Sequence, residues 1–119
     1  MKVLLVEGNS AVRRMIRQLV AHPGTWIQEC VDGASAVAAY AVSRPDFVLM
    51  DVAMTDPDGI TATEQIKAMD PTARIILVSD YDDTALRESA RRAGACAYVL
   101  KDNLLEVKDF LREFSNECN

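Results

Sequence analysis

The chain has 119 residues, of which 50% are hydrophobic and 26% charged, with 13 Lys and Arg against 18 Asp and Glu. This length suits one compact domain over residues 1–119, and the net charge of −5 argues against nonspecific binding to nucleic acid or an anionic membrane. No apolar stretch approaches the roughly 18 residues of a membrane span, and Met1–Val6 is too short for a signal peptide. We therefore expect a soluble, cytoplasmic domain with no direct nucleic-acid or membrane partner.

The cysteines and the single histidine exclude several kinds of site. Cys30, Cys96 and Cys118 are widely spaced and form no Cys-x-x-Cys pair, and His22 has no potential metal ligand beside it. This spacing is not typical of a structural zinc site. We expect three reduced thiols that pack as small hydrophobes, and neither Ser-His-Asp nor Cys-His catalysis.

Five short apolar runs alternate with segments of helix length. In chain order, the expected strands are Val3–Val6, Trp26–Val31, Phe47–Met50, Ile75–Val78 and Ala95–Leu100. Four of these runs are almost continuously apolar, as expected for parallel strands covered on both faces. The second run is more mixed in character, which suits an edge strand.

The intervening segments predict five helices. The first begins at Asn9 or Ser10, ends before Pro23-Gly24, and carries an apolar stripe of Val12, Met15, Ile16, Leu19 and Val20. The later helices are expected at residues 34–42, 59–69, 82–93 and 103–114, the last with a stripe of Leu104, Val107, Leu111 and Phe114. Strict alternation of strand and helix predicts an α/β, doubly wound sandwich around a central parallel sheet.

Polar side chains follow four of the five expected strands. They are Glu7, Asp51, Ser79 and Lys101. In an open parallel sheet, ligands bind beyond the carboxyl ends of the strands, so these four side chains should converge at one edge. Any one of them alone is typical of a loop, but their joint placement at strand ends indicates a functional site.

Across nearly its whole length, the chain resembles the receiver domain of bacterial response regulators. The resemblance rests on the stretches Val3–Glu7, Asp46–Met54, Asp58-Gly59, Ile75–Ser79 and Gly94–Lys101. It implies a (βα)5 flavodoxin/CheY-like fold with a five-stranded parallel sheet in the order 2-1-3-4-5. Lys101-Asp102, after a helix start at Asp82-Asp83, is most similar to the NarL/FixJ class, whose members usually precede a DNA-binding output domain that is missing from this chain.

The resemblance also implies a role for the chain in a two-component system. Asp51 would be the phosphoacceptor, phosphorylated by a sensor histidine kinase or a phosphotransferase. Mg²⁺ would be held by Asp51, by the backbone carbonyl of Ala53, and by Glu7 directly or through water. No enzyme activity is expected beyond self-catalysed phosphoryl transfer to Asp51 and hydrolysis of the product.

Three further residues would read the phosphoryl group in such a domain. Lys101 would pair first with the carboxylate and then with the phosphoryl oxygens, and Ser79 would hydrogen-bond the phosphoryl group. Tyr98 matches the family's switch aromatic, whose ring turns inward as Ser79 moves. The signal would leave through the face made by the fourth helix, fifth strand and fifth helix, which could also form a homodimer.

The chain departs from the family pattern at several positions, among them Gly8, Asp80 and Asp102, and Thr55 replaces a common proline in the loop after Asp51. Gly8 stands where receivers usually carry a second acid that ligates the metal, and losing one carboxylate should cost more than about 1 kcal/mol, or tenfold or more in Mg²⁺ affinity. Asp80 replaces a small residue, and we hypothesise that it partly compensates for Gly8 or restricts access to Asp51. Asp102 replaces the usual proline after Lys101, which leaves the isomer of that peptide bond open.

Two alternative functions follow from these departures and from the fold class. The first is a degenerate pseudo-receiver that acts as a phosphorylation-independent protein-interaction module. The second is a flavodoxin-like cofactor enzyme, which needs a Ser/Thr/Gly-rich phosphate loop after the first strand. The segment Glu7–Ala11 does not provide such a loop.

Overall fold

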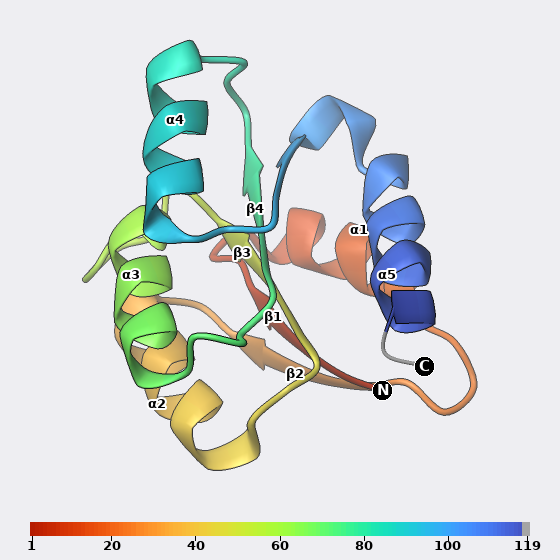
Figure 1. Cartoon of the computed structure of the whole chain (residues 1–119). Coiled ribbons are helices and arrows are strands. Elements are labelled where there is room, and N and C mark those ends of the chain that lie inside the picture. Colours follow the sequence, from red (N-terminus) through yellow and green to blue (C-terminus); the bar gives the residue numbers. More distant parts are fainter. Residues whose placement is uncertain (118–119) are drawn as a thin grey trace.

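The computed structural model describes residues 1–117 of the chain, with side chains up to residue 113. Strands and helices alternate from end to end (Figure 1). Their bounds are β1 (Lys2–Val6), α1 (Ser10–Val20), β2 (Trp26–Cys30), α2 (Gly33–Ser43), β3 (Phe47–Asp51), α3 (Gly59–Met69), β4 (Ile75–Ser79), α4 (Thr84–Ala93), β5 (Ala97–Leu100) and α5 (Leu105–Glu117). None of the helices within these described residues is long and apolar enough to cross a bilayer.

The sheet confirms the predicted fold class. Its five strands are all parallel and lie in the order β2-β1-β3-β4-β5. Strand β2 lies at one edge, as its mixed composition predicts, and its Trp26 is 65% exposed. The inner strands β3 and β4 are buried at every position, because helices cover both of their faces.

Helices pack on the two faces of the sheet in unequal numbers. Helices α1 and α5 cover one face, and α2, α3 and α4 cover the other (Figure 1). Alternate residues of each strand point to opposite faces, so Leu5 and Leu49 join the α1/α5 core while Leu4 and Met50 join the other. These two apolar layers hold the carboxyl ends of the strands together at one edge of the sheet.

Two expected boundaries are wrong by two residues, and local hydrogen bonding explains both. The fifth strand begins at Ala97 because Gly94 caps α4 at φ 103° and the N–H of Ala95 donates to a carbonyl inside that helix. Helix α4 begins at Thr84 because the side chain of Asp83 is its N-cap, accepting a hydrogen bond from the N–H of Leu86 at 3.0 Å.

The connection into the last helix also differs from the expected single helix. A short 3₁₀ turn over Lys101–Asn103 precedes α5. The peptide bond after Lys101 is trans, and the cis bond found within residues 1–117 is Asp56–Pro57. The predicted stripe of Leu104, Val107 and Leu111 is buried, while the side chain of Phe114 falls outside the described residues.

Two predicted apolar assignments are corrected by the structure. Met15 is 51% exposed, whereas Ile16 and Val20 are the buried residues of α1. Successive residues of a helix are turned by about 100° about its axis, so Met15 points away from the side on which Ile16 is buried. The thiols of Cys30 and Cys96 are free as expected, but Cys30 is only half-buried and Cys96 is exposed, so neither is a core residue. Cys118 lies outside the described residues.

Gly59 allows a close approach between the start of α3 and the end of β3. A Cβ atom at this position would lie 2.2 Å from the carbonyl oxygen of Asp51. We therefore expect Gly59→Ala to lower the free energy of unfolding by about 1–3 kcal/mol, because rigid backbone must shift to make room. Urea unfolding measures this change.

Gly8→Ala is the matched control for that substitution. Its added Cβ would lie 3.6 Å from the carbonyl oxygen of Val31 and 3.9 Å from Cε of Met54, which are ordinary contacts. The control should change stability by no more than about 0.5 kcal/mol. Equal effects of the two substitutions would contradict the steric explanation.

Candidate functional site

The side chain of Lys101 gathers three carboxylates at the carboxyl edge of the sheet. Its Nζ lies 2.9 Å from Oδ2 of Asp51, 3.4 Å from Oε2 of Glu7 and 3.7 Å from Oδ2 of Asp80. The Lys101, Asp51 and Glu7 side chains are 14%, 8% and 3% exposed, whereas that of Asp80 is 61% exposed. The structure therefore brings together three residues expected at this edge, with Asp80 at the rim.

Asp51 is held by donors on both of its carboxylate oxygens. Oδ1 accepts a hydrogen bond from the N–H of Ala53 at 3.0 Å, and Oδ2 accepts one from Nζ of Lys101 at 2.9 Å. Asp51 is the last residue of β3, a central strand buried throughout. The carboxylate is thus fixed by its own turn and by the chain segment that follows β5.

Glu7 is buried with one carboxylate oxygen left without a hydrogen bond. Its Oε1 accepts from the N–H of Asn9 at 3.1 Å, while Oε2 has no hydrogen-bond partner among the described residues and meets Lys101 only as an ion pair. Burial raises the pKa of Glu7; the negative charge of Asp51 adds to this effect, which the Asn9 hydrogen bond and Lys101 oppose. A buried carboxylate oxygen in this state can accept a cation.

Lys101 remains an ammonium group despite its partial burial. Desolvation acts to lower its pKa, but the hydrogen bond and charge of Asp51 raise it, with further contributions from Glu7 and Asp80. The net result is a pKa above the ordinary value for lysine. The single positive charge of Lys101 is therefore shared among the carboxylates of Glu7, Asp51 and Asp80.

The carboxylates provide a sparse set of metal ligands. No group of three or more His, Cys, Asp or Glu residues within the described part of the chain is placed to hold a metal ion. Mg²⁺ is nevertheless often held by one or two carboxylates together with waters and phosphate oxygens. Glu7, with its unbonded Oε2, and Asp51 fit such a two-carboxylate site.

A Cβ atom at Gly8 would make only ordinary contacts with its neighbours. The nearest atoms to a Cβ built there belong to Val31 and Met54, both at ordinary van der Waals distance, and the residue has no positive φ. A Cβ atom could therefore be added at Gly8 without steric conflict.

Ser79 and Tyr98 are connected through the backbone of Tyr81. The buried hydroxyl of Ser79 accepts a hydrogen bond from the N–H of Tyr81 at 3.0 Å, and the hydroxyl of Tyr98 donates to the carbonyl of Tyr81 at 2.8 Å. The guanidinium of Arg87 lies 4.8 Å from the centre of the Tyr98 ring. Two of the predicted site residues thus share hydrogen bonds with the backbone of one residue, Tyr81.

The loop after β3 is attached to the start of α2. The N–H of Gly33 donates to the carbonyl of Thr55, and that of Ala34 to the carbonyl of Asp56, both at 3.0 Å. A Cβ at Gly33 would lie 2.2 Å from the carbonyl oxygen of Pro57, so the two segments are in close contact. The loop that carries Ala53 is therefore supported from outside the sheet.

Sequence reasoning missed two groups that support the site. Arg13 lies outside the apolar stripe of the first helix, a position typical of a solvent-facing residue, yet its guanidinium donates to the carbonyl of Glu7 at 2.8 Å and pairs with Glu29 at 3.5 Å. The backbone N–H and carbonyl of Tyr81 could not be singled out from the sequence, because every residue other than proline has both groups. The only available signal for Arg13 was its position near the start of the first helix.

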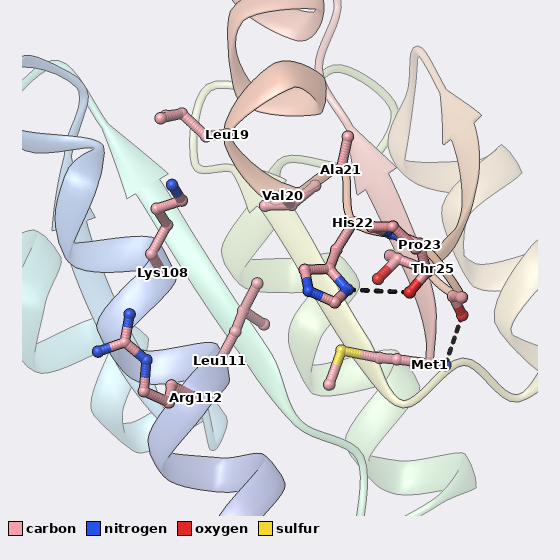
Figure 2. A pocket seen from close by; sticks show the side chains of 11 residues that line it. Met1, Leu19, Val20, Ala21, His22, Pro23, Thr25, Lys108, Leu111 and Arg112 are labelled. Atoms are coloured by element: carbon pink, nitrogen blue, oxygen red, sulfur yellow. Dashed lines mark hydrogen bonds between the residues drawn. The ribbon is translucent and has the colours of Figure 1, made fainter.

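A groove lies at the opposite end of the sheet from Asp51. It has a volume of about 450 Å³ and lies between the end of α1, the turn before β2, and α5 (Figure 2). Leu111 and the Met1 side chain form part of its apolar lining, and Lys108 and Arg112 stand along α5. None of the predicted site residues lines this groove.

Residues 3–110 match the family model described as the response regulator receiver domain. The chain belongs to this family. The receiver domain is 36% identical over 111 residues to the chemotaxis protein CheY of Bacillus subtilis. This match covers 89% of this chain and 92% of that protein.

Solved structures agree with this assignment. A two-component response regulator of the LuxR family from Aurantimonas has a TM-score of 0.88 at 31% identity, covering 95% of this receiver domain and 83% of that chain. The CheX–CheY–BeF₃–Mg²⁺ complex from Borrelia burgdorferi has a TM-score of 0.87 at 25% identity, covering 96% and 88%. The prediction of a receiver domain of a two-component response regulator is confirmed.

The raised pKa of Glu7 predicts a pH-dependent effect of Glu7→Gln. Because the folded chain binds this proton more tightly than the unfolded chain, the ionised carboxylate lowers stability above its ordinary pKa of 4.5. Glu7→Gln should therefore increase the free energy of unfolding at neutral pH, and the gain should disappear well below that pKa. Urea unfolding across this pH range tests the expectation; a loss of stability at neutral pH would show that the attraction to Lys101 outweighs burial.

Proposed function

We propose that this receiver domain is a phosphoacceptor, phosphorylated on Asp51 by a sensor histidine kinase or a phosphotransferase. The observation that carries the proposal is the 2.9 Å contact between Lys101 and Asp51 at the carboxyl edge of the sheet. It supplies a carboxylate nucleophile beside a permanent cation, and phosphoryl transfer depends mainly on positioning and charge neutralisation. Phosphorylation would then switch a partner or an output domain.

The transfer requires few chemical groups from the chain. A carboxylate oxygen of Asp51 attacks phosphorus, the bond from phosphorus to the imidazole nitrogen of the donor breaks, and its electron pair stays on that nitrogen. Lys101 meets the additional negative charge on the phosphoryl oxygens because it remains an ammonium group. The N–H of Ala53 orients the carboxylate through its bond to Oδ1.

Mg²⁺ would be held by Asp51, Glu7 and the carbonyl of Ala53. The unbonded Oε2 of Glu7 supports this assignment, as does the Mg²⁺ in the related Borrelia complex. The bound ion would neutralise charge on the phosphoryl oxygens. Since Gly8 offers no carboxylate, we propose that the affinity for Mg²⁺ is lower than a third acid would provide.

The switch would use the hydrogen bonds around Tyr81. If the hydroxyl of Ser79 turns to the phosphoryl group, the N–H of Tyr81 loses its acceptor, and the bond from Tyr98 to the same residue is disturbed. Reorientation of Tyr98 would then alter the face formed by α4, β5 and α5. We propose this face as the surface for an output partner or a homodimer.

The alternative is a pseudo-receiver that acts through protein contacts without phosphorylation. Two observations favour it: Gly8 stands where a receiver usually has an acid, and no group of three or more His, Cys, Asp or Glu among the described residues is placed to hold a metal ion. The two functions make opposite predictions about covalent labelling of Asp51.

Acetyl phosphate or phosphoramidate with Mg²⁺ should add one phosphoryl group to the chain. Intact mass spectrometry measures the addition, and hydroxylamine should remove it because an acyl phosphate is labile to this nucleophile. Asp51→Asn should remain unlabelled while keeping the shape of the side chain. The absence of labelling, or labelling that persists in Asp51→Asn, would favour the pseudo-receiver or another acceptor.

Gly8→Asp should increase Mg²⁺ affinity about tenfold or more, because it adds a carboxylate at a position where a Cβ makes only ordinary contacts. Isothermal titration measures the affinity directly. Gly8→Asn is the matched control, since it adds nearly the same volume without the charge. Equal affinities of the two variants would argue against a metal site beside Gly8.

A further inference from the structure

Asp80 differs from the other acids at the carboxyl edge in how its charge is used. The acids at or after the carboxyl ends of the strands include Glu7, Asp32, Asp51, Asp56, Asp58, Asp80, Asp82, Asp83 and Asp102. Three of them cap helices: Asp32, Asp58 and Asp83 accept hydrogen bonds from helix N–H groups. Asp82 instead pairs with Arg87 at 2.8 Å. Among the described residues, the charged partner of Asp80 is Lys101.

The position of Asp80 places its charge at the entrance to Asp51. Its side chain is 61% exposed, whereas the Asp51 and Glu7 side chains behind it are almost fully buried. Its Oδ2 lies 3.7 Å from Nζ of Lys101, a separation at which the attraction is electrostatic rather than a hydrogen bond. Lys101 is thus attracted toward the solvent side as well as toward Asp51.

Neither a metal-ligand role nor a folding role accounts for this side chain. Asp80 forms no three-acid group with Glu7 and Asp51 that could hold a metal ion. It also caps no helix, and the N–H of the following residue, Tyr81, is bonded to Ser79 instead. Its carboxylate can therefore be neutralised without removing a structural hydrogen bond.

The charge balance at this entrance is unfavourable for anions. One ammonium group faces three carboxylates, and the whole chain carries a net charge of −5. Small phosphodonors are anions and must approach Asp51 from solvent. The Asp80 carboxylate repels such an anion, and it also competes for the Lys101 ammonium group that the incoming phosphoryl group requires.

We propose that Asp80 is a selectivity residue that disfavours small anionic phosphodonors at Asp51 and so favours a phosphoryl group presented by a protein. A protein donor can bring its own cationic side chains to the rim and can offset the repulsion, whereas a free acyl phosphate cannot. The inference rests on the proposed phosphorylation of Asp51. It assigns to Asp80 a control over which donors react, not a part in the transfer itself.

The test compares Asp80→Asn with the unmodified chain at saturating Mg²⁺ for each. Labelling rates are measured with acetyl phosphate and with phosphoramidate, which carries less negative charge at neutral pH, at low and high sodium chloride. Asp80→Asn should react roughly two- to fivefold faster with acetyl phosphate at low salt, the effect of about one partly screened charge. The gain should be smaller with phosphoramidate and should shrink as salt increases.

Two further variants separate local from general effects of charge. Glu64→Gln removes one exposed carboxylate from α3 that has no ion-pair partner within the described residues, and its rate should not change. Asp80→Glu keeps the charge and should retain the slow reaction with acetyl phosphate.

Each outcome bears on one proposal. Failure of both the unmodified chain and Asp80→Asn to become labelled would refute the phosphoacceptor function. Normal labelling with no acceleration in Asp80→Asn would overturn the selectivity role alone. Equal acceleration with both donors at every salt concentration would also overturn it, because charge repulsion cannot produce that pattern.

Discussion

The ammonium group of Lys101 is the interaction on which the carboxyl edge of this receiver domain depends. Asp51 ends β3 and Lys101 follows β5, so the ion pair between them spans the end of the intervening strand β4. Removing one partner from a buried ion pair leaves an uncompensated charge, which is far more costly than losing an exposed pair. The same contact therefore organises the edge and holds the Asp51 carboxylate beside a cation.

The rest of the fold makes that contact possible because packing on both faces holds the carboxyl ends of the inner strands side by side. Alternating apolar residues bind β1, β3 and β4 to helices on both faces, and Gly59 lets α3 begin directly against Asp51. From this rigid base, the hydrogen bonds at Tyr81 connect Ser79 to Tyr98. The site thus combines a carboxylate at the end of a fully buried strand with a link made of two hydrogen bonds.

The sequence predicts most of this arrangement because its signals are strong and local. Continuous apolar runs identify the inner strands, and the rule that carboxyl ends of parallel strands share an edge brings Glu7, Asp51 and Lys101 together. What it cannot predict depends on three-dimensional detail. The start of β5 shifts because the N–H of Ala95 still bonds to α4, and Arg13 turns toward the Glu7 carbonyl instead of toward solvent. Hydrogen bonds of backbone groups, such as those of Tyr81, cannot be predicted from the type of the residue.

The attachment of the β3–α3 loop to α2 has a consequence for the whole molecule. Two amides at the beginning of α2 are already saturated by carbonyls of Thr55 and Asp56, and Gly33 leaves no gap against Pro57. That helix terminus is consequently closed to an external anion, and the loop cannot swing away unless α2 follows or both bonds break. Displacement of the loop beside Ala53 therefore requires displacement of α2, the helix that follows the edge strand β2, or loss of both hydrogen bonds.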